Sequence, residues 1–254
     1  MSGRLTVIGL GPGDARWLTP QADAALADAE AIYGYGAYLE QVPVRPGQAR
    51  HPSDNREEQA RAAAALERAA DGANVAVVSG GDPGVFAMAA AVCAEIEAGP
   101  PVWRELDVAI VPGITAMLAV AARVGAPLGH DFCALSLSDN LKPWALVEQR
   151  LDAAAGAGFI IAIYNPVSRA RPWQLGAAFD RVVRLLPQST PVIFGRAIGR
   201  AGERVDVTTL GAAKSIAADM ATLVIVGSSD TRIVVREGRA PLVYTPRAVA
   251  RADA

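Results

Sequence analysis

Hydrophobic residues in this 254-residue chain form short continuous runs, separated by alanine-rich stretches in which apolar residues recur every three or four positions. The short runs predict buried strands, and the longer period predicts amphipathic helices. Strands are predicted at residues 5–10, 30–34, 75–78, 106–111, 132–138, 159–164, 191–195, 204–209 and 221–226, with an edge strand at 234–243. Helices are predicted at residues 20–29, 56–70, 84–95, 116–124, 143–155 and 173–186.

The alternation of strands and helices predicts an α/β fold with mostly parallel sheets, because parallel strands need a crossover connection. A second series of strands begins near residue 132, which indicates a domain boundary near Pro112. We therefore expect an N-terminal α/β domain at residues 1–112, a C-terminal α/β domain at residues 113–246 and a tail at residues 247–254. Ligands of such sheets bind at the carboxyl ends of the strands.

The most informative stretch runs from Val75 to Phe86, where a β-branched run stops at Gly80-Gly-Asp-Pro-Gly84. Paired glycines let a ligand approach the backbone closely, and Asp82 could hold a cation or a hydroxyl group. Pro83 suits the first turn of the helix predicted to follow. Because an ordinary strand-to-helix turn uses the same residue types, these residues alone leave both interpretations open.

Glycines at positions 9, 11 and 13 suggest a dinucleotide-binding loop, but the spacing differs from the Gly-x-Gly-x-x-Gly fingerprint. The next helix is predicted to begin only at Pro20, with Thr19 as its N-cap, so its N-terminus would not meet a pyrophosphate. A Walker loop is excluded because no Gly-Lys-Ser/Thr follows. Three nearby aromatics, Tyr33, Tyr35 and Tyr38, could line a flat ligand or close the edge of a helix–sheet contact.

Composition narrows the class of protein further. With 24 Lys and Arg against 26 Asp and Glu, the chain has no basic field, and we expect no nucleic-acid partner. Its two cysteines, Cys93 and Cys133, indicate neither a disulfide framework nor a zinc site and are expected in the core. The start of the chain lacks a secretory signal, and no apolar run reaches the roughly 18 residues of a membrane span. We therefore expect a cytoplasmic protein that uses no membrane.

The sequence gives little support for nucleophilic or metal chemistry. It contains no Gly-x-Ser-x-Gly elbow, and neither His51 nor His130 has a serine or cysteine partner or metal-ligand spacing. No metal is therefore expected, and the glycine-rich loops favour an organic cofactor that carries the chemistry. The segment from His51 to Glu58 is predicted to be a polar, solvated loop, although it contains a possible acid or base and an arginine.

Several arginines follow predicted strands in the second half of the chain. Carboxylates or phosphates of a polyanionic substrate would find planar, bidentate partners there. These arginines are Arg169, Arg171, Arg196, Arg200 and Arg232.

Three motifs carry a resemblance to a known family: Val7-Ile-Gly-Leu-Gly-Pro-Gly-Asp14, Gly80-Gly-Asp-Pro-Gly-Val-Phe86 and Val111-Pro-Gly-Ile-Thr-Ala116. In this order and at these separations they resemble the tetrapyrrole methylase family of class III methyltransferases, from about residue 4 to residue 232. Other segments are similar to the subgroup that acts on precorrin-3B in cobalamin synthesis. These are Ser136 to Asp139 with Pro143-Trp144, Tyr164 to Pro166, and Val226 to Arg232.

The resemblance implies a homodimer of chains with two αβα domains, S-adenosylmethionine in a cofactor cleft between the domains and the tetrapyrrole in an adjoining trough. Gly81, Asp82 and Phe86 would hold the methionine end of the cofactor, and Asn165, Ala197 and Thr222 would lie around its adenine and ribose. The complete set of implied cofactor-binding residues is Pro12, Gly81, Asp82, Phe86, Thr115, Ala116, Asn165, Ala197 and Thr222.

The same resemblance implies methyl transfer to carbon 17 of the macrocycle, followed by contraction of the ring. Contraction needs proton transfer, for which the candidate catalytic residues are Asp14, Asp54 and Ser136. The partner would be a tetrapyrrole with peripheral carboxylates, and the implied substrate-binding residues are Arg56, Arg169 and Arg232.

Three other interpretations stay open on the sequence. The chain could be a sibling methylase that acts at another carbon, such as carbon 20 or 11, or the anaerobic enzyme that uses a cobalt-loaded ring. It could also be a nucleotide-binding regulatory module that performs no chemistry. The siblings share the cofactor loops, so the motifs separate them poorly.

Overall fold

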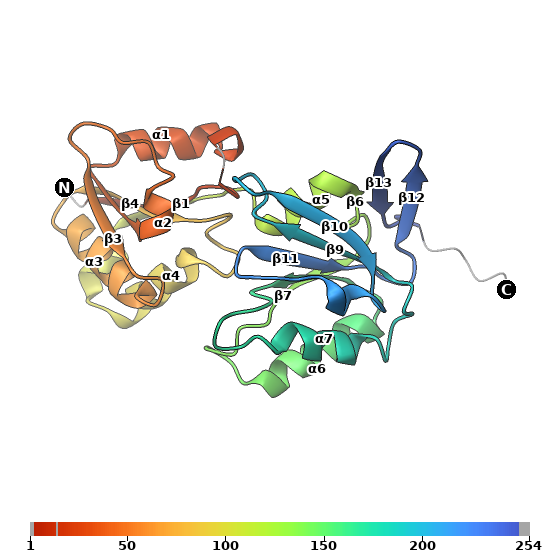
Figure 1. Ribbon diagram of the computed structural model, residues 1–254. Coiled ribbons are helices and arrows are strands. Elements are labelled where there is room, and N and C mark those ends of the chain that lie inside the picture. The colour runs from red at the N-terminus through yellow and green to blue at the C-terminus, as the bar shows by residue number, and fades with distance from the viewer. Residues whose placement is uncertain (1–2, 14, 249–254) are drawn as a thin grey trace. The chain divides into compact units, whose positions relative to one another are not determined.

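The computed structural model describes residues 3–13 and 15–248. The chain separates into two compact units, Met1–Ala116 and Met117–Ala254, and Figure 1 traces their elements. This division falls shortly after Pro112. Asp14 and residues 249–254 of the predicted tail lie outside the described residues.

The first unit is built on a five-stranded sheet with the order β3-β2-β4-β1-β5, and every pair is parallel. The strands are β1 (Arg4–Gly9), β2 (Ala31–Tyr35), β3 (Ala49–Ser53), β4 (Asn74–Ser79) and β5 (Asp107–Val111). The α-helices are α1 (Pro20–Asp28), α2 (Gly36–Leu39), α3 (Glu58–Ala70) and α4 (Met88–Ala98), with 3-10 turns at Ala15–Trp17 and Pro101–Glu105. This parallel α/β unit is the one that the sequence predicts.

Helices cover both faces of the first sheet, which explains its continuous apolar strands. Val75 and Val77 of β4 pack with α3 and α4, whereas Ala76 and Val78 pack on the opposite face with α1 and α2. All four of these residues are fully buried. The first helix begins as predicted, because the Thr19 hydroxyl accepts a hydrogen bond from the Ala22 backbone N–H at 3.1 Å.

The second unit contains a five-stranded sheet with the order β10-β9-β11-β8-β7 and a separate sheet with the order β12-β13-β6. The strands are β6 (Gly125–Ala126), β7 (Phe132–Ser136), β8 (Ile160–Tyr164), β9 (Pro191–Arg196), β10 (Arg204–Thr209), β11 (Thr222–Val226), β12 (Arg232–Arg236) and β13 (Arg239–Tyr244). The helices are α5 (Ala116–Val124), α6 (Trp144–Gly156) and α7 (Gln174–Val182), with a 3-10 turn at Ala213–Ser215.

The α/β class is confirmed, but the second large sheet differs from the expected mostly parallel arrangement. Only β7 and β8 pair in parallel, whereas β11 runs antiparallel to both β8 and β9, and β10 runs antiparallel to β9. The reason lies in the connections. Helices α6 and α7 return the chain for parallel strands, but β9 to β11 are joined by loops and one 3-10 turn, which suit antiparallel neighbours.

Three local predictions are wrong. His51 to Ser53 form the edge strand β3 rather than a loop, and an edge strand tolerates Pro52. Helix α4 begins at Met88 rather than Gly84, because Phe86 adopts a φ of 53° that a helix cannot contain. The expected single strand at 234–243 is the hairpin β12–β13, whose turn uses Gly238 at a φ of 64°.

Two further expectations concern burial and membranes. Cys93 is exposed and Cys133 is partly buried, so Cys93 does not belong to the core as predicted. Among the described residues, none of the helices combines the length and the apolar composition that a membrane span requires.

Phe194 tests the core of the second unit. Its side chain is 1% exposed and meets the Phe179 ring edge-on, with 6.1 Å between the centroids. Phe194→Ala should lower the free energy of unfolding by about 3–5 kcal/mol, because it removes buried surface and leaves a cavity. Phe132→Ala, at a position 40% exposed in the same unit, should cost about 1 kcal/mol or less. Urea denaturation measures both, and equal losses would contradict the assignment of this core.

Candidate functional site

Three loops at the carboxyl ends of β1, β4 and β5 are held against one another in the first unit. Gly11 and Gly81 exchange backbone hydrogen bonds of 3.1 and 2.7 Å. A Cβ atom added at Gly9 would lie 2.6 Å from the Gly113 nitrogen, and one added at Gly113 would lie 2.2 Å from the Gly81 oxygen. Real side chains cannot occupy these positions, so the glycines allow contacts between the three backbones.

Asp82 fixes two of these loops to each other. Its Oδ1 accepts from the Gly84 backbone N–H at 2.8 Å, and its Oδ2 accepts from the Gly113 backbone N–H at 3.0 Å. Both oxygens therefore shape the loops that follow β4 and β5. In this geometry the carboxylate stabilises the loops, a role different from binding a cation or acting as a catalytic acid.

Other predicted cofactor residues of the first unit lie on these same loops. Gly81 has a φ of 69°, and a Cβ atom there would lie 3.6 Å from Thr115 Cα. Thr115 is buried, Pro12 and Ala116 are half-buried, and the Phe86 side chain is 52% exposed. The structure thus brings Pro12, Gly81, Asp82, Thr115 and Ala116 together at one edge of the first sheet, and the Phe86 turn follows directly after that loop.

The second unit has a corresponding edge. Ser136 ends β7, Asn165 follows β8, Ala197 follows β9, and Thr222 begins β11. Because β11 runs antiparallel to β8 and β9, its amino end lies at the edge where those strands end. The Asn165 side-chain amide donates to Ser136 Oγ at 2.9 Å, so two of these residues are in direct contact.

Backbone strain coincides with the predicted cofactor residues. Among the described residues, the non-glycine positions with positive φ are Phe86 at 53°, Asn165 at 50° and Ala197 at 49°. Such conformations are uncommon outside glycine and gather at functional sites. All three positions belong to the set of cofactor-binding residues that the family resemblance implies.

The candidate catalytic residues differ in their surroundings. Asp14 lies outside the described residues. Asp54 is exposed in the first unit, and its Oδ1 accepts from the Asn55 backbone N–H at 2.5 Å. Ser136 is buried in the second unit, where its Oγ also accepts from the Ser138 backbone N–H at 3.3 Å. The Ser136 hydroxyl proton is therefore available for donation.

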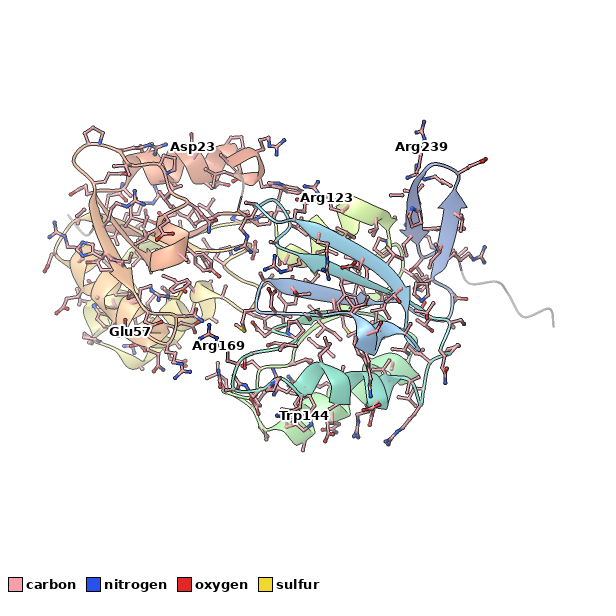
Figure 2. All side chains as sticks on the ribbon, viewed as in Figure 1. Asp23, Glu57, Arg123, Trp144, Arg169 and Arg239 are labelled. Atoms are coloured by element: carbon pink, nitrogen blue, oxygen red, sulfur yellow. The ribbon has the colours of Figure 1, made fainter. Side chains whose placement is uncertain are left out.

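The three candidate substrate-binding arginines lie on separate elements. Arg56 is exposed just before α3, and Arg169 is exposed on the loop that follows β8, where Figure 2 marks it. Arg232 begins β12, beyond the carboxyl end of β11. Because β11 is antiparallel to β8, Arg232 lies beyond the opposite edge of this sheet from Asn165, and its grouping with Arg169 from a parallel sheet is wrong.

Arg171 joins the loop after β7 to the loop after β8. Arg171 Nη1 donates to Asp139 Oδ1 and, at 2.5 Å, to Asn140 Oδ1. Burial raises the pKa of Asp139, but its hydrogen bonds, first the one from Arg171, together lower that pKa below the ordinary value. Arg171 is thus engaged within the protein rather than free for a ligand.

Sequence reasoning missed Arg61, which is 5% exposed on α3. Its guanidinium donates to Ser53 Oγ at 2.7 Å, to the Asp54 carbonyl at 2.6 Å and to Met88 Sδ at 3.2 Å. Burial lowers its pKa, and nearby carboxylates oppose that shift. Arg61 therefore joins the end of β3 to the start of α4. No local pattern marks an arginine inside an alanine-rich helix as buried.

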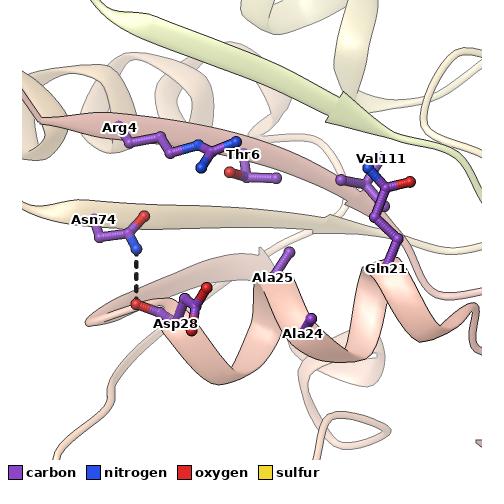
Figure 3. A pocket seen from close by; sticks show the side chains of 8 residues that line it. All are labelled: Arg4, Thr6, Gln21, Ala24, Ala25, Asp28, Asn74 and Val111. Atoms are coloured by element: carbon purple, nitrogen blue, oxygen red, sulfur yellow. Dashed lines mark hydrogen bonds between the residues drawn. The ribbon is translucent and has the colours of Figure 1, made fainter.

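Among the described residues, neither a pocket beside α1 nor a cluster of possible metal ligands coincides with the candidate site. Figure 3 shows a pocket along α1 between Arg4 and Val111, with Asn74 donating to the Asp28 carbonyl at 2.8 Å. It contains none of the predicted site residues. In the part of the chain that the structure describes, no three His, Cys, Asp or Glu side chains are grouped as a metal ion would need.

Gly113 tests the contact between the loops. Gly113→Ala should lower the free energy of unfolding by about 1–3 kcal/mol, because the new methyl group would collide with the Gly81 carbonyl. Gly36→Ala is the matched control, since no atom lies within 4 Å of its added Cβ, and it should be neutral or slightly stabilising. Thermal and urea unfolding measure both variants, and an unaffected Gly113→Ala protein would contradict the contact.

Comparison with known proteins gives a consistent result. The family described as Tetrapyrrole (Corrin/Porphyrin) Methylases matches residues 4–214. A precorrin-3B C(17)-methyltransferase from Sinorhizobium sp is 60% identical over 253 residues, covering 100% of both chains. The cobalamin biosynthesis protein CobIJ of Mycobacterium bovis is 47% identical over 97% of this chain, which spans 48% of that longer protein.

Solved structures agree with the sequence comparison. The crystal structure of the methyltransferase CobJ has a TM-score of 0.89 at 47% identity, covering 96% of this chain and 100% of that one. A uroporphyrin-III C-methyltransferase from Thermus thermophilus, complexed with S-adenosylhomocysteine, has a TM-score of 0.65 at 20% identity over 89% of this chain and 92% of that one, and shows the fold alone. On this sequence and structural similarity, the chain belongs to the tetrapyrrole (corrin/porphyrin) methylase family.

Proposed function

We propose that this chain methylates precorrin-3B at carbon 17, with S-adenosylmethionine as methyl donor, and contracts the ring to precorrin-4 in cobalamin biosynthesis. The observation that carries the proposal is the 60% identity, over the full length of both chains, to a precorrin-3B C(17)-methyltransferase. The glycine-locked loops and the strained residues at the two sheet edges support it, because they are suited to holding a ligand through the backbone.

The described residues fit the methyl donor. The loops of the first unit present backbone groups with no Cβ in the way at Gly81, and they would hold the methionine end. Asn165, Ala197 and Thr222 of the second unit would surround the adenine and ribose. When bound, S-adenosylmethionine supplies an electrophilic methyl group, so the protein's task is to align the two molecules and to exclude water.

Ring contraction requires the protein to move a proton at a hydroxyl group of the substrate. In this proposal one of the candidate carboxylates takes the proton from the substrate hydroxyl, while Ser136, whose Oγ already accepts two hydrogen bonds, donates a hydrogen bond to the substrate oxygen. Asp54 and Asp14 remain the candidate carboxylates. Arg56 and Arg169 would pair with the peripheral acetates and propionates; Arg232 is not included, because it lies beyond the other end of β11.

A second candidate is the corresponding reaction on a cobalt-loaded ring. A probable cobalt-factor III C(17)-methyltransferase from Salmonella typhimurium is 41% identical over 96% of this chain and 98% of its own length. The two reactions would share the methyl donor and differ in the ring. The homodimer, the cytoplasmic location, the absence of a nucleic-acid or membrane partner and the cofactor cleft between the domains stay predictions.

The main experiment separates these candidates. The protein is incubated with S-adenosylmethionine that carries a labelled methyl group and with either precorrin-3B or cobalt-factor III. Mass spectrometry and NMR of the products should show one label at carbon 17 of precorrin-3B. A methylated ring that keeps its original size would refute the contraction, and turnover of the cobalt form alone would favour the second candidate. Calorimetry with S-adenosylhomocysteine, NAD and ATP tests the regulatory alternative, since binding of NAD or ATP alone would support it.

Arg169 tests substrate recognition apart from cofactor binding. Arg169→Ala should raise the KM for the tetrapyrrole by about tenfold, because one charge-assisted pair with a carboxylate is lost. The affinity for S-adenosylhomocysteine should stay unchanged. Arg184→Ala, which removes another exposed arginine of the second unit, should affect neither constant. Equal losses of substrate and cofactor affinity in Arg169→Ala would count against the assigned role.

A further inference from the structure

Asp219 is the centre of a hydrogen-bond network at the site edge of the second unit. It precedes β11, and its Oδ1 accepts from the Ala221 backbone N–H at 2.9 Å and from Thr222 Oγ1 at 2.8 Å. Its Oδ2 accepts from Arg196 Nε at 2.8 Å. One carboxylate thus joins the end of β9 to the beginning of β11. Neither the family motifs nor the spacing of the sequence singles out this residue.

The network determines what the Thr222 hydroxyl can do. Its proton is donated to Asp219 Oδ1, and one of its lone pairs accepts from the Asp219 backbone N–H at 3.0 Å. A hydroxyl group has one proton and two lone pairs, so a single lone pair remains. Thr222 is therefore held as a hydrogen-bond acceptor toward any ligand, and it can receive an N–H or O–H but cannot donate.

The same network supports the strained Ala197. Its backbone N–H donates at 2.9 Å to the carbonyl of Ala221, whose own N–H is held by Asp219. Arg196, the residue immediately before Ala197, gives its Nε to the same carboxylate. An alanine with positive φ persists only where its surroundings hold it in that conformation. Asp219 binds both Arg196, which precedes Ala197, and Ala221, whose carbonyl accepts from Ala197.

We propose that Asp219 is a positioning residue for S-adenosylmethionine: without touching the cofactor, it holds Ala197 and the Thr222 hydroxyl in the geometry that receives the adenosine half. This inference rests on the proposed function and adds a residue to it. It also assigns a polarity to the contact, because the Thr222 side chain would receive a donor group of the ligand, such as the exocyclic amine of adenine or a ribose hydroxyl.

The ionised state of Asp219 is consistent with this role. Burial raises its pKa, but hydrogen bonds from Thr222, Arg196 and Ala221, in decreasing order, together lower the pKa below the ordinary carboxyl value. At neutral pH the side chain is therefore an acceptor only. An asparagine in its place would turn one oxygen into an NH₂ group that faces either the Thr222 hydroxyl or the Arg196 guanidinium.

The test compares Asp219→Asn with a matched control, Asp206→Asn. Asp206 accepts from Arg204 Nε at 2.7 Å on the neighbouring strand β10, so each variant disturbs one partly exposed arginine–aspartate pair. Asp219→Asn should raise the Kd for S-adenosylhomocysteine, measured by calorimetry, and the KM for S-adenosylmethionine by about tenfold or more, with kcat within about twofold of wild type. Asp206→Asn should change none of these, and the melting temperatures of the two variants should agree within a few degrees.

Variants of Thr222 test the same network from its other end. Thr222→Val removes the hydroxyl while keeping the shape, and it should weaken binding as much as Asp219→Asn, whereas Thr222→Ser should keep wild-type affinity. The double variant Asp219→Asn/Thr222→Val should be no weaker than either single variant, because both remove one coupled contact.

The outcomes separate the inference from the proposed function. Wild type that fails to bind S-adenosylhomocysteine would overturn both. Wild type that binds, together with an Asp219→Asn protein of equal affinity, would overturn the inference alone. A loss of affinity that accompanies a fall in melting temperature absent from Asp206→Asn would show a merely structural role. If Asp219→Asn does not fold, the Thr222 variants decide, since a Thr222→Val protein with wild-type affinity would also overturn the inference.

Discussion

The close approach of three backbones at Gly9, Gly81 and Gly113 is the constraint on which the first unit's edge depends. Each added Cβ atom at Gly9 or Gly113 would fall under 3 Å from a backbone atom of a neighbouring loop. The contact forces the loops after β1, β4 and β5 into one surface, and Asp82 then closes it with two charge-assisted hydrogen bonds to backbone N–H groups. Because each oxygen accepts one of these bonds, the acidic residue of the motif helps to set the shape of the loop.

The second unit reaches a similar result by different means. At its edge, Asn165 and Ala197 adopt positive φ just after β8 and β9. Ser136, at the end of β7, accepts a hydrogen bond from the Asn165 side chain. Asp219, which precedes β11, accepts from the Ala221 N–H, and the Ala221 carbonyl accepts from the Ala197 N–H. In both units a carboxylate or hydroxyl that accepts backbone and side-chain donors fixes the loop, which leaves other backbone groups at the edge for a ligand.

The sequence predicts the strands and helices well where local patterns determine them. Buried runs such as Val75 to Val78 and the Thr19 cap carry their signal within a few residues. The direction of β11 carries no such signal, because an apolar run reads the same for parallel and antiparallel neighbours. The error at Arg232 follows directly from that ambiguity. The roles of Asp219 and Arg61 could not be predicted for another reason. Some of their hydrogen-bond partners lie on other elements, and only the folded chain brings these donors and acceptors together.

The proposed cofactor-binding residues act mainly through the backbone, whereas the proposed substrate-binding residues act through side chains. This difference explains why the fold indicates less about the substrate than about the cofactor. Glycines and strained turns act through the backbone, so they leave a recognisable pattern of residue types that spans the family motifs. Arg56 and Arg169 act, in our proposal, through single flexible side chains on exposed loops, and many sequences could place a cation there. A protein with 20% identity therefore keeps the fold with a TM-score of 0.65, whereas the fold does not specify the loop side chains that we propose to bind the ring.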